Sequence, residues 1–242
     1  MQVTYLGHSG FLLEWDTCYW LFDYFEGTIP DLNPQKEIFV FCSHSHPDHF
    51  SPSVFELAEK YPSVNYIFSN EVRNACKKLA KKEAKTLPDI YFLKSRTDTE
   101  FVTILGKALK IHTLLSTDCG CAFFIEFDGK TIYHAGDLHW WYWEGEDPDW
   151  NKKMTADYKN EMEYLKDKEI DLAFNVLDPR QEKDYALGMN YFLNHTHTRH
   201  MFPMHFWNDF TIMEKYLQKH SVPNHTSFYV IGQNGQNFEI ML

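Results

Sequence analysis

The sequence predicts an α/β protein, and three observations lead to this class. Short runs of β-branched and aromatic residues recur along the 242 residues and end at glycine, proline or aspartate, as strands do. Between residues 38 and 82 two such runs alternate with segments that begin like helices, which is typical of parallel strands covered by helices. No linker, repeat or low-complexity tract divides the chain. The predicted organisation is therefore a single domain spanning residues 1–242.

The first half predicts an antiparallel start followed by strand–helix alternation. Runs at residues 3–6, 11–14 and 19–23 are separated by glycines and an aspartate, where turns are expected. After the apolar run 38–42, Ser51 and Pro52 predict the N-cap and first turn of a helix. A buried strand at 64–68 then leads to Asn70, which is expected to cap a helix ending at Lys82.

The second half predicts more strands, three helices and two hairpins. The expected strands are 101–105, 109–115, 121–127, 131–134 and 170–176, and the expected helices start at 155 or cover 185–194 and 209–218. Asp128-Gly129 is a strong turn signal, so the strands on either side of it should form a hairpin. The same reasoning at Asn234-Gly235 predicts a closing hairpin of residues 227–231 and 238–242.

Composition limits the partners. The net charge of −11 argues against a nucleic-acid-binding surface, and the one dense basic run, residues 77–85, is expected to be a solvated helix face. No apolar run is long enough to span a bilayer, and residues 1–7 already read as a strand rather than a cleaved leader. Five cysteines without a Cys-x-x-Cys pair predict reduced thiols, which suits a cytoplasmic protein.

The most informative segment places three imidazoles and a carboxylate within six residues. His44 and His46 are two apart, so they point at one spot only where the backbone is extended or turning, and Pro47 prevents a simple helix there. Asp48 and His49 are adjacent and should aim at a second spot a few ångströms away. Neutral imidazole and carboxylate suit Zn²⁺ and similar ions. The segment therefore predicts two metal sites sharing one loop.

The pattern His44-x-His46-x-Asp48-His49 after an apolar run resembles the signature of the metallo-β-lactamase-fold hydrolase superfamily. This resemblance implies a four-layer αββα sandwich and metal-dependent hydrolysis. The string Tyr5-Leu6-Gly7-His8-Ser9-Gly10-Phe11 is similar to the opening of the branch that includes ascorbate-6-phosphate lactonase, in which this histidine can lie near the mouth of the active site. Taken alone, His8 is more typical of a turn.

The resemblance also assigns residues farther along the chain. Asp23 ends the third strand and would support the metal-binding loop through hydrogen bonds rather than touch a metal. Asp137 follows a strand and Gly136, and it matches the aspartate that bridges both metals in the family. His205 ends a short apolar run and matches the last metal-binding histidine.

The third motif departs from the family pattern, because Thr117 occupies the usual histidine position. Asp118 and His112 are the two substitutes, and Asp118 is favoured since it lies at a strand mouth whereas His112 lies in mid-strand. An aspartate there would hold the cation more firmly, make it a weaker Lewis acid and widen metal choice toward Mn²⁺ or Fe²⁺.

Together these residues predict a binuclear centre. His44, His46 and Asp118 would hold one divalent cation, Asp48, His49 and His205 the other, and Asp137 would lie between them. Zn²⁺ is the expected metal, with Mn²⁺ or Fe²⁺ as alternatives, and Asp48 and Asp137 are the expected catalytic carboxylates. A metal-bound hydroxide would cleave a small ester, lactone or phosphoester. An iron-binding redox or sensor protein and an inactive metal-binding scaffold are the alternatives.

Several features near the centre stay open. The segment 140–143 is the densest aromatic stretch and predicts either a pocket wall or lid, or packing into the core or a subunit interface of a homo-oligomer. Arg180 is the best nearby anion binder, although an ion pair with Asp178 is the plainer expectation. The proton donor to the leaving group is His139, His8 or a second water. Small molecules, rather than nucleic acid or membrane, are the expected partners.

Overall fold

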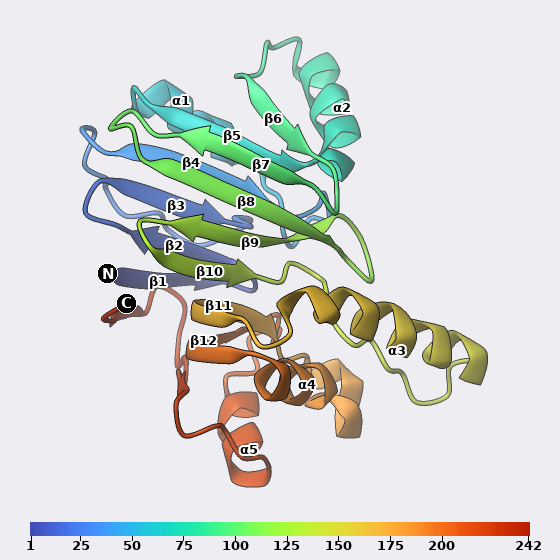
Figure 1. Ribbon diagram of the computed structural model, residues 1–242. Coiled ribbons are helices and arrows are strands. Elements are labelled where there is room, and N and C mark those ends of the chain that lie inside the picture. Colours follow the sequence, from blue (N-terminus) through green and yellow to red (C-terminus); the bar gives the residue numbers. More distant parts are fainter.

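The computed structural model describes residues 1–242 and contains two mixed sheets that pack face to face, with helices on the outside (Figure 1). The first sheet has the strand order β14 (Asn237–Glu239), β1 (Gln2–Gly7), β2 (Gly10–Glu14), β3 (Cys18–Phe22), β4 (Glu37–Cys42), β5 (Val64–Ser69) and β6 (Ile90–Leu93). The second has the order β13 (Ser227–Phe228), β12 (His197–Met204), β11 (Glu169–Val176), β10 (Lys130–His134), β9 (Cys121–Phe127), β8 (Ala108–Leu115) and β7 (Asp98–Val102).

Strand β4 shows why the chain forms four layers. Its side chains alternate between two cores, as the two-residue period of a strand requires. Phe39 and Phe41 join the main core between the sheets, whereas Ile38, Val40 and Cys42 join a second core under the helices of the first sheet. The strand is therefore buried on both faces, which is the arrangement of an αββα sandwich. The predicted fold class is confirmed.

Five α-helices cover the outer faces. They are α1 (Leu57–Lys60), α2 (Arg73–Glu83), α3 (Pro148–Met162), α4 (Leu187–His195) and α5 (Thr211–Lys219). In Figure 1, α1 and α2 lie beside the first sheet, and α3, α4 and α5 lie beside the second. Short 3₁₀ segments, Pro52–Glu56, Asn70–Val72, Glu163–Leu165 and Pro179–Asp184, extend or connect these helices.

The predicted helix starts are partly right. Ser51 caps the first helical segment by accepting from the backbone N–H of Ser53, as expected. The cap before α2 is Ser69 rather than Asn70, since its hydroxyl accepts from Glu71 N. Helix α3 begins at Pro148, well before the expected residue 155, because Asp147 accepts from the first N–H groups and proline suits the first helical position.

The expected strand at residues 101–105 is wrong in its boundaries, and strand β6 was not predicted. Strand β7 ends at Val102, and the chain then turns, with Gly106 N donating to Thr103 O at 2.8 Å. Ile104 and Leu105 lie on this turn and remain largely exposed. Their apolar side chains resemble a strand in sequence, but the hairpin between β7 and β8 needs residues there for its turn.

The expected C-terminal hairpin is also wrong. Strand β13 pairs in parallel with β12 in the second sheet, whereas β14 pairs antiparallel with β1 in the first. The turn at Gly235 exists, but its N–H donates to Tyr5 O at 2.8 Å, and Tyr5 N donates to Gln236 O at 3.0 Å. The turn therefore binds the edge of β1 and carries the chain from one sheet to the other.

The parallel parts of both sheets position the site. Strands β3 to β6 are parallel neighbours in the first sheet, and β10 to β13 are parallel neighbours in the second. The carboxyl ends of parallel strands meet at one edge of a sheet, which is where α/β proteins bind ligands. The antiparallel hairpin of β9 and β10 around Asp128-Gly129 is confirmed, and it delivers Ala135, Gly136 and Asp137 to this edge.

Candidate metal centre

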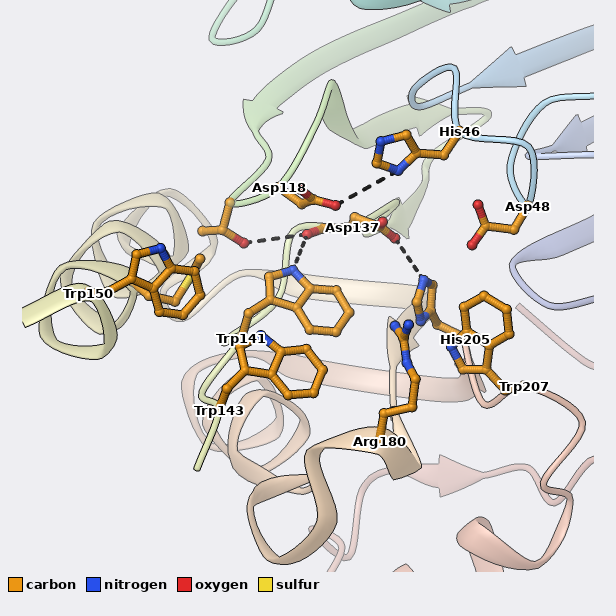
Figure 2. A pocket seen from close by; sticks show the side chains of 12 residues that line it. His46, Asp48, Asp118, Asp137, Trp141, Trp143, Trp150, Arg180, His205 and Trp207 are labelled. Carbon is orange, nitrogen blue, oxygen red and sulfur yellow. Dashed lines mark hydrogen bonds and ion pairs between the residues drawn. The ribbon is translucent and has the colours of Figure 1, made fainter. Parts of the chain in front are cut away.

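Five strand ends bring the titratable residues together. In the first sheet, Asp23 follows β3 and the segment from His44 to His49 follows β4. In the second sheet, Asp137 follows β10, Asp178 follows β11 and His205 follows β12. Figure 2 shows Asp48, Asp137 and His205 converging from separate parts of the chain.

Glycines let the two sheets approach closely at this point. Gly120 has φ +71°, and a Cβ added there would lie 1.9 Å from Ser43 O. Gly136 has φ +50°, and its added Cβ would lie 2.6 Å from Ser43 Cβ. Both positions require glycine because the backbone is left-handed and the neighbouring chain leaves no space. Cys121 N donates to Ser43 O at 3.1 Å, which joins the metal-binding loop to the second sheet.

Asp137 lies at the middle of the cluster. Its Oδ1 is 3.2 Å from His49 Nε2 and 3.4 Å from His205 Nε2, and its Oδ2 is 3.3 Å from His44 Nε2. Burial opposes ionisation, but the charges of His49 and His205 hold the pKa of Asp137 well below its usual range. The two carboxylate oxygens thus face histidines on both sides, as a bridging carboxylate would.

Several buried atoms of the cluster make no hydrogen bond. His8 Nε2, His44 Nε2, His49 Nε2 and Asp137 Oδ1 are all inaccessible to solvent and make no hydrogen bond. Buried polar groups are normally satisfied, so unbonded atoms that converge on one place indicate a ligand-binding site. Three sets of side chains offer ligand atoms within 4.8 Å of one another: His8, Asp48, His49 and His205; His44, His46 and Asp137; and His46, Asp118 and Cys119. Imidazole and carboxylate donors fit a divalent cation.

Asp23 orients the histidine loop, as the resemblance to the family implied. It is fully buried, and it accepts hydrogen bonds from Ser43 N at 2.7 Å and from Ser43 Oγ at 2.6 Å. His49 Nδ1 donates to Asp23 Oδ2 at 2.9 Å, because a carboxylate can only accept. This bond turns His49 Nε2 toward the centre. Burial disfavours its charge, but Asp137 and Asp23 raise the pKa of His49 to about 10, and the same negative surroundings favour a metal cation.

Asp178 orients His205 in the way that Asp23 orients His49, a role that the sequence did not predict. It is fully buried, and it accepts from His205 Nδ1 at 3.0 Å. Arg180 forms the expected ion pair with it, donating from Nε to both carboxylate oxygens at 2.9 and 3.0 Å. Burial opposes ionisation, but these bonds lower the pKa of Asp178. Its place at a strand end, matching Asp23, was the signal in the sequence.

His8 is both a turn residue and a member of the cluster. It lies in the tight connection between β1 and β2, with φ +52°. His205 N donates to His8 O at 3.1 Å, and His8 Nε2 is 3.3 Å from Asp48 Oδ2. Burial lowers the pKa of His8 to about 4, so the imidazole is neutral near pH 7 and can offer a lone pair. The sequence singled out this residue but did not place it among the ligands.

The structure separates the two candidates for the third motif. Asp118 Oδ2 lies 3.9 Å from His46 Nδ1, and Cys119 offers its sulfur to the same group. His112 lies elsewhere, on β8, where its Nδ1 donates to Asp98 at 2.8 Å and its ring stacks on Tyr164 at 3.8 Å. Of the two candidates, Asp118 is the one close enough to share a cation with His46.

A cavity of about 370 Å³ opens over the cluster (Figure 2). Its lining residues are His46, Asp48, Thr117, Asp118, Asp137, Trp141, Trp143, Trp150, Met154, Arg180, His205 and Trp207. Trp141 and Trp143 thus form part of the wall, whereas Trp140 packs against Tyr158 and Tyr191. His139 is buried behind the wall and bonds through Nε2 to Gln181 at 2.7 Å.

The fold and the site define a class of protein: two mixed sheets between helices, with a histidine- and aspartate-rich cluster at the strand ends that could hold metal. Residues 2–144 match the family described as the beta-lactamase superfamily domain. This match covers more than half of the chain and includes His44 to His49, Asp118 and Asp137. The chain belongs to this family.

Two relatives are consistent with this assignment, and a solved structure shares the fold. The chain is 30% identical over 148 residues to a UPF0173 metal-dependent hydrolase of Desulforamulus reducens, covering 57% of this chain and 62% of the relative. It is 28% identical over 157 residues to a UPF0173 metal-dependent hydrolase of Carboxydothermus hydrogenoformans, covering 59% of this chain and 64% of the relative. Each match thus spans less than two thirds of the relative's length. The metallo-beta-lactamase fold protein YhfI of Bacillus subtilis shares the fold, with a TM-score of 0.62, 13% identity and 98% of each chain covered.

None of the helices combines the length and the apolar character that a bilayer crossing requires.

Proposed function

We propose that this protein is a binuclear metal-dependent hydrolase that cleaves a small ester, lactone or phosphoester. The observation that carries the proposal is the convergence of buried imidazole nitrogens and one carboxylate oxygen, all without partners, below an open cavity. The relatives described as metal-dependent hydrolases support it. The opening similar to the ascorbate-6-phosphate lactonase branch makes lactones a class to test first.

The ligand sets that we propose follow the geometry of the cluster. His44, His46 and Asp118 would hold one cation, and Asp48, His49 and His205 the other, with His8 as a further donor to the second. Asp137 would join them, because its oxygens face His44 on one side and His49 and His205 on the other. Zn²⁺ is the metal we expect, with Mn²⁺ or Fe²⁺ as alternatives, since oxygen donors widen the choice.

When bound, two divalent cations lower the pKa of a shared water and stabilise negative charge on the attacked group. The side chains around them would accept protons and orient the ligands. Asp48 lines the cavity, where it can accept a proton, and its Oδ2 lies 3.3 Å from His8 Nε2. Asp23 and Asp178 fix the orientation of His49 and His205. His139 does not line the cavity, so it is a poor candidate for the leaving-group proton.

The surroundings support a small substrate. A volume of about 370 Å³ suits a metabolite. The net charge of −11 disfavours nucleic acid, and five free cysteines are compatible with a cytoplasmic location.

The test is metal analysis combined with activity assays. Protein loaded with Zn²⁺, Mn²⁺ or Fe²⁺ is assayed against carboxylic esters, lactones, phosphodiesters and thioesters. Two metal equivalents with hydrolytic turnover would support the proposal. Bound iron with O₂ uptake and no hydrolysis would support the redox alternative, and tight metal without turnover would support the scaffold alternative.

A further inference from the structure

Tryptophan is concentrated around the cavity. Four of the seven tryptophans line it: Trp141, Trp143, Trp150 and Trp207. They come from three separate elements, the segment after β10, helix α3 and the segment after β12. Trp150 and Trp207 expose 40% and 45% of their surface. Large apolar side chains exposed together around a cavity indicate a ligand that covers them.

The tryptophan faces are arranged as walls. Trp141 and Trp143 lie nearly parallel, with an interplanar angle of 9° and ring centroids 5.9 Å apart. Trp141 Nε1 donates to Asp137 O at 3.1 Å, which fixes this ring directly beside the proposed bridging residue. Trp207 stands on the other side, near His205 (Figure 2). A flat group entering the cavity would therefore meet indole surfaces within reach of the metal centre.

Arg180 is held rigidly between these walls. Its guanidinium carbon lies 4.5 Å from the centroid of Trp207 and 6.0 Å from that of Trp143. The ion pair with Asp178 uses Nε and Nη2, which leaves Nη1 for an acceptor oxygen of a bound molecule. The side chain is about half exposed and lines the cavity. A ligand would thus find aromatic faces and one fixed hydrogen-bond donor side by side.

We propose that Trp143, Trp207 and Arg180 form a subsite for a planar aromatic ring that carries an acceptor oxygen. This inference rests on the proposed function and narrows it: the substrate is an ester, lactone or phosphoester of an aromatic compound. Stacking on the indoles holds the ring, Arg180 holds its oxygen, and the scissile bond lies toward Asp137. A saturated ring of similar size and charge would lose the stacking but keep the other contacts.

The experiment compares benzoate with cyclohexanecarboxylate, which share charge and approximate size but differ in aromaticity. Titration calorimetry with zinc-loaded protein is expected to show roughly three- to tenfold tighter binding of benzoate, the gain of one or two stacking contacts. The variants Trp143→Leu and Trp207→Leu should each reduce this preference, and Trp207→Phe should retain it. Tyr91→Leu removes an exposed aromatic ring that does not line the cavity and should change nothing.

Equal affinity for the two ligands, or a preference that survives both leucine variants, would overturn the subsite. Failure of the proposed function gives a different result: no ester, lactone or phosphoester is hydrolysed, yet the tryptophan-dependent preference for benzoate persists. If aliphatic esters are hydrolysed and benzoate shows no preference, the hydrolase proposal stands and the aromatic subsite does not.

Discussion

Asp23 and Asp178 each orient one histidine of the cluster, the first at an edge of one sheet and the second at an edge of the other. Each follows a parallel strand, is fully buried, and accepts a hydrogen bond from Nδ1 of a histidine, His49 or His205. The bond selects the tautomer that leaves Nε2 free and turns it toward Asp137. The centre is therefore positioned by residues that make no contact with the cavity.

Replacing Asp178 with asparagine should weaken metal binding without unfolding the protein. The change removes the anionic acceptor that orients His205, and losing such a partner typically costs about 10- to 100-fold in metal affinity. Competition against a chromophoric chelator would measure this loss.

The matched control is Asp171→Asn on β11, the strand that precedes Asp178; the carboxylate of Asp171 pairs with Lys130 and Arg199 away from the centre. Unchanged metal affinity in Asp178→Asn, or an equal loss in both variants, would show that Asp178 does not position His205 for metal.

His46→Ala should abolish turnover and remove about one equivalent of metal while the protein stays folded. The side chain of His46 is 46% exposed and therefore contributes little to the core. Its loss should change the free energy of unfolding by no more than about 0.5 kcal/mol in metal-free protein. Metal analysis and urea unfolding give the two measurements.

His225→Ala, at an exposed histidine outside the cavity, is the control and should keep both metal and activity. Full activity in His46→Ala would mean that the catalytic assignment is wrong.

The turn between β8 and β9 is the element that brings the two sheets together at the centre. It carries Asp118 and Cys119, and Gly120 packs against Ser43 and His44 of the other sheet. The turn between β7 and β8 also contains a left-handed glycine, Gly106, but nothing lies within 4 Å of its added Cβ. Comparing substitutions at the two glycines therefore distinguishes the cost of a left-handed backbone from the cost of close packing.

Gly106→Ala should cost about 1–2 kcal/mol of unfolding free energy, the penalty of a left-handed backbone. Gly120→Ala should cost this amount plus about 1–3 kcal/mol for the forced shift of Ser43, and it should also weaken metal binding. Urea unfolding of the metal-free proteins provides the comparison. Equal costs for the two substitutions would mean that the contact between Gly120 and Ser43 is not tight in solution.

Over the whole molecule, the proposed ligands come from both sheets. His44, His46, Asp48 and His49 belong to the first sheet, and Asp118, Asp137 and His205 to the second. A bound metal would therefore link the two halves of the sandwich and bind only the folded chain.

Chelation should consequently lower the melting temperature. At a free metal concentration about 1,000 times the dissociation constant, binding adds about 4 kcal/mol to the unfolding free energy. Calorimetry with and without a chelator measures the difference, and His46→Ala should show a smaller one. The same melting temperature in both conditions would argue against a metal held by both sheets.

Much of the fold could be predicted from local patterns. The apolar run of β4 and the turn at Asp128-Gly129 identified a parallel strand and a hairpin because each signal lies within a few residues. The pairing of β13 and β14 could not be predicted this way. Asn234-Gly235 indicates a turn, but whether the following strand folds back or joins β1 depends on an edge more than 200 residues away in the chain.

Part of the candidate site could also be predicted from local patterns, and part could not. His44, His46, Asp48 and His49 are close in sequence, so their spacing alone indicated a metal-binding loop. The ligand roles assigned to them, to Asp118 and to His205 stay predictions, as does the single-domain organisation. Trp150 and Trp207 carried no local signal, because their importance comes from facing one cavity.

Spacing along the chain was enough to indicate the α/β class and the histidine loop, and the resemblance to the family indicated the strand ends that carry Asp137 and His205. Only the tertiary structure showed that Asp118, and not His112, lies beside His46, that Asp178 orients His205, and that His8 belongs to the cluster. The physical reason is that a side chain's neighbours across two sheets depend on strand pairing and register between distant segments, which no local pattern records.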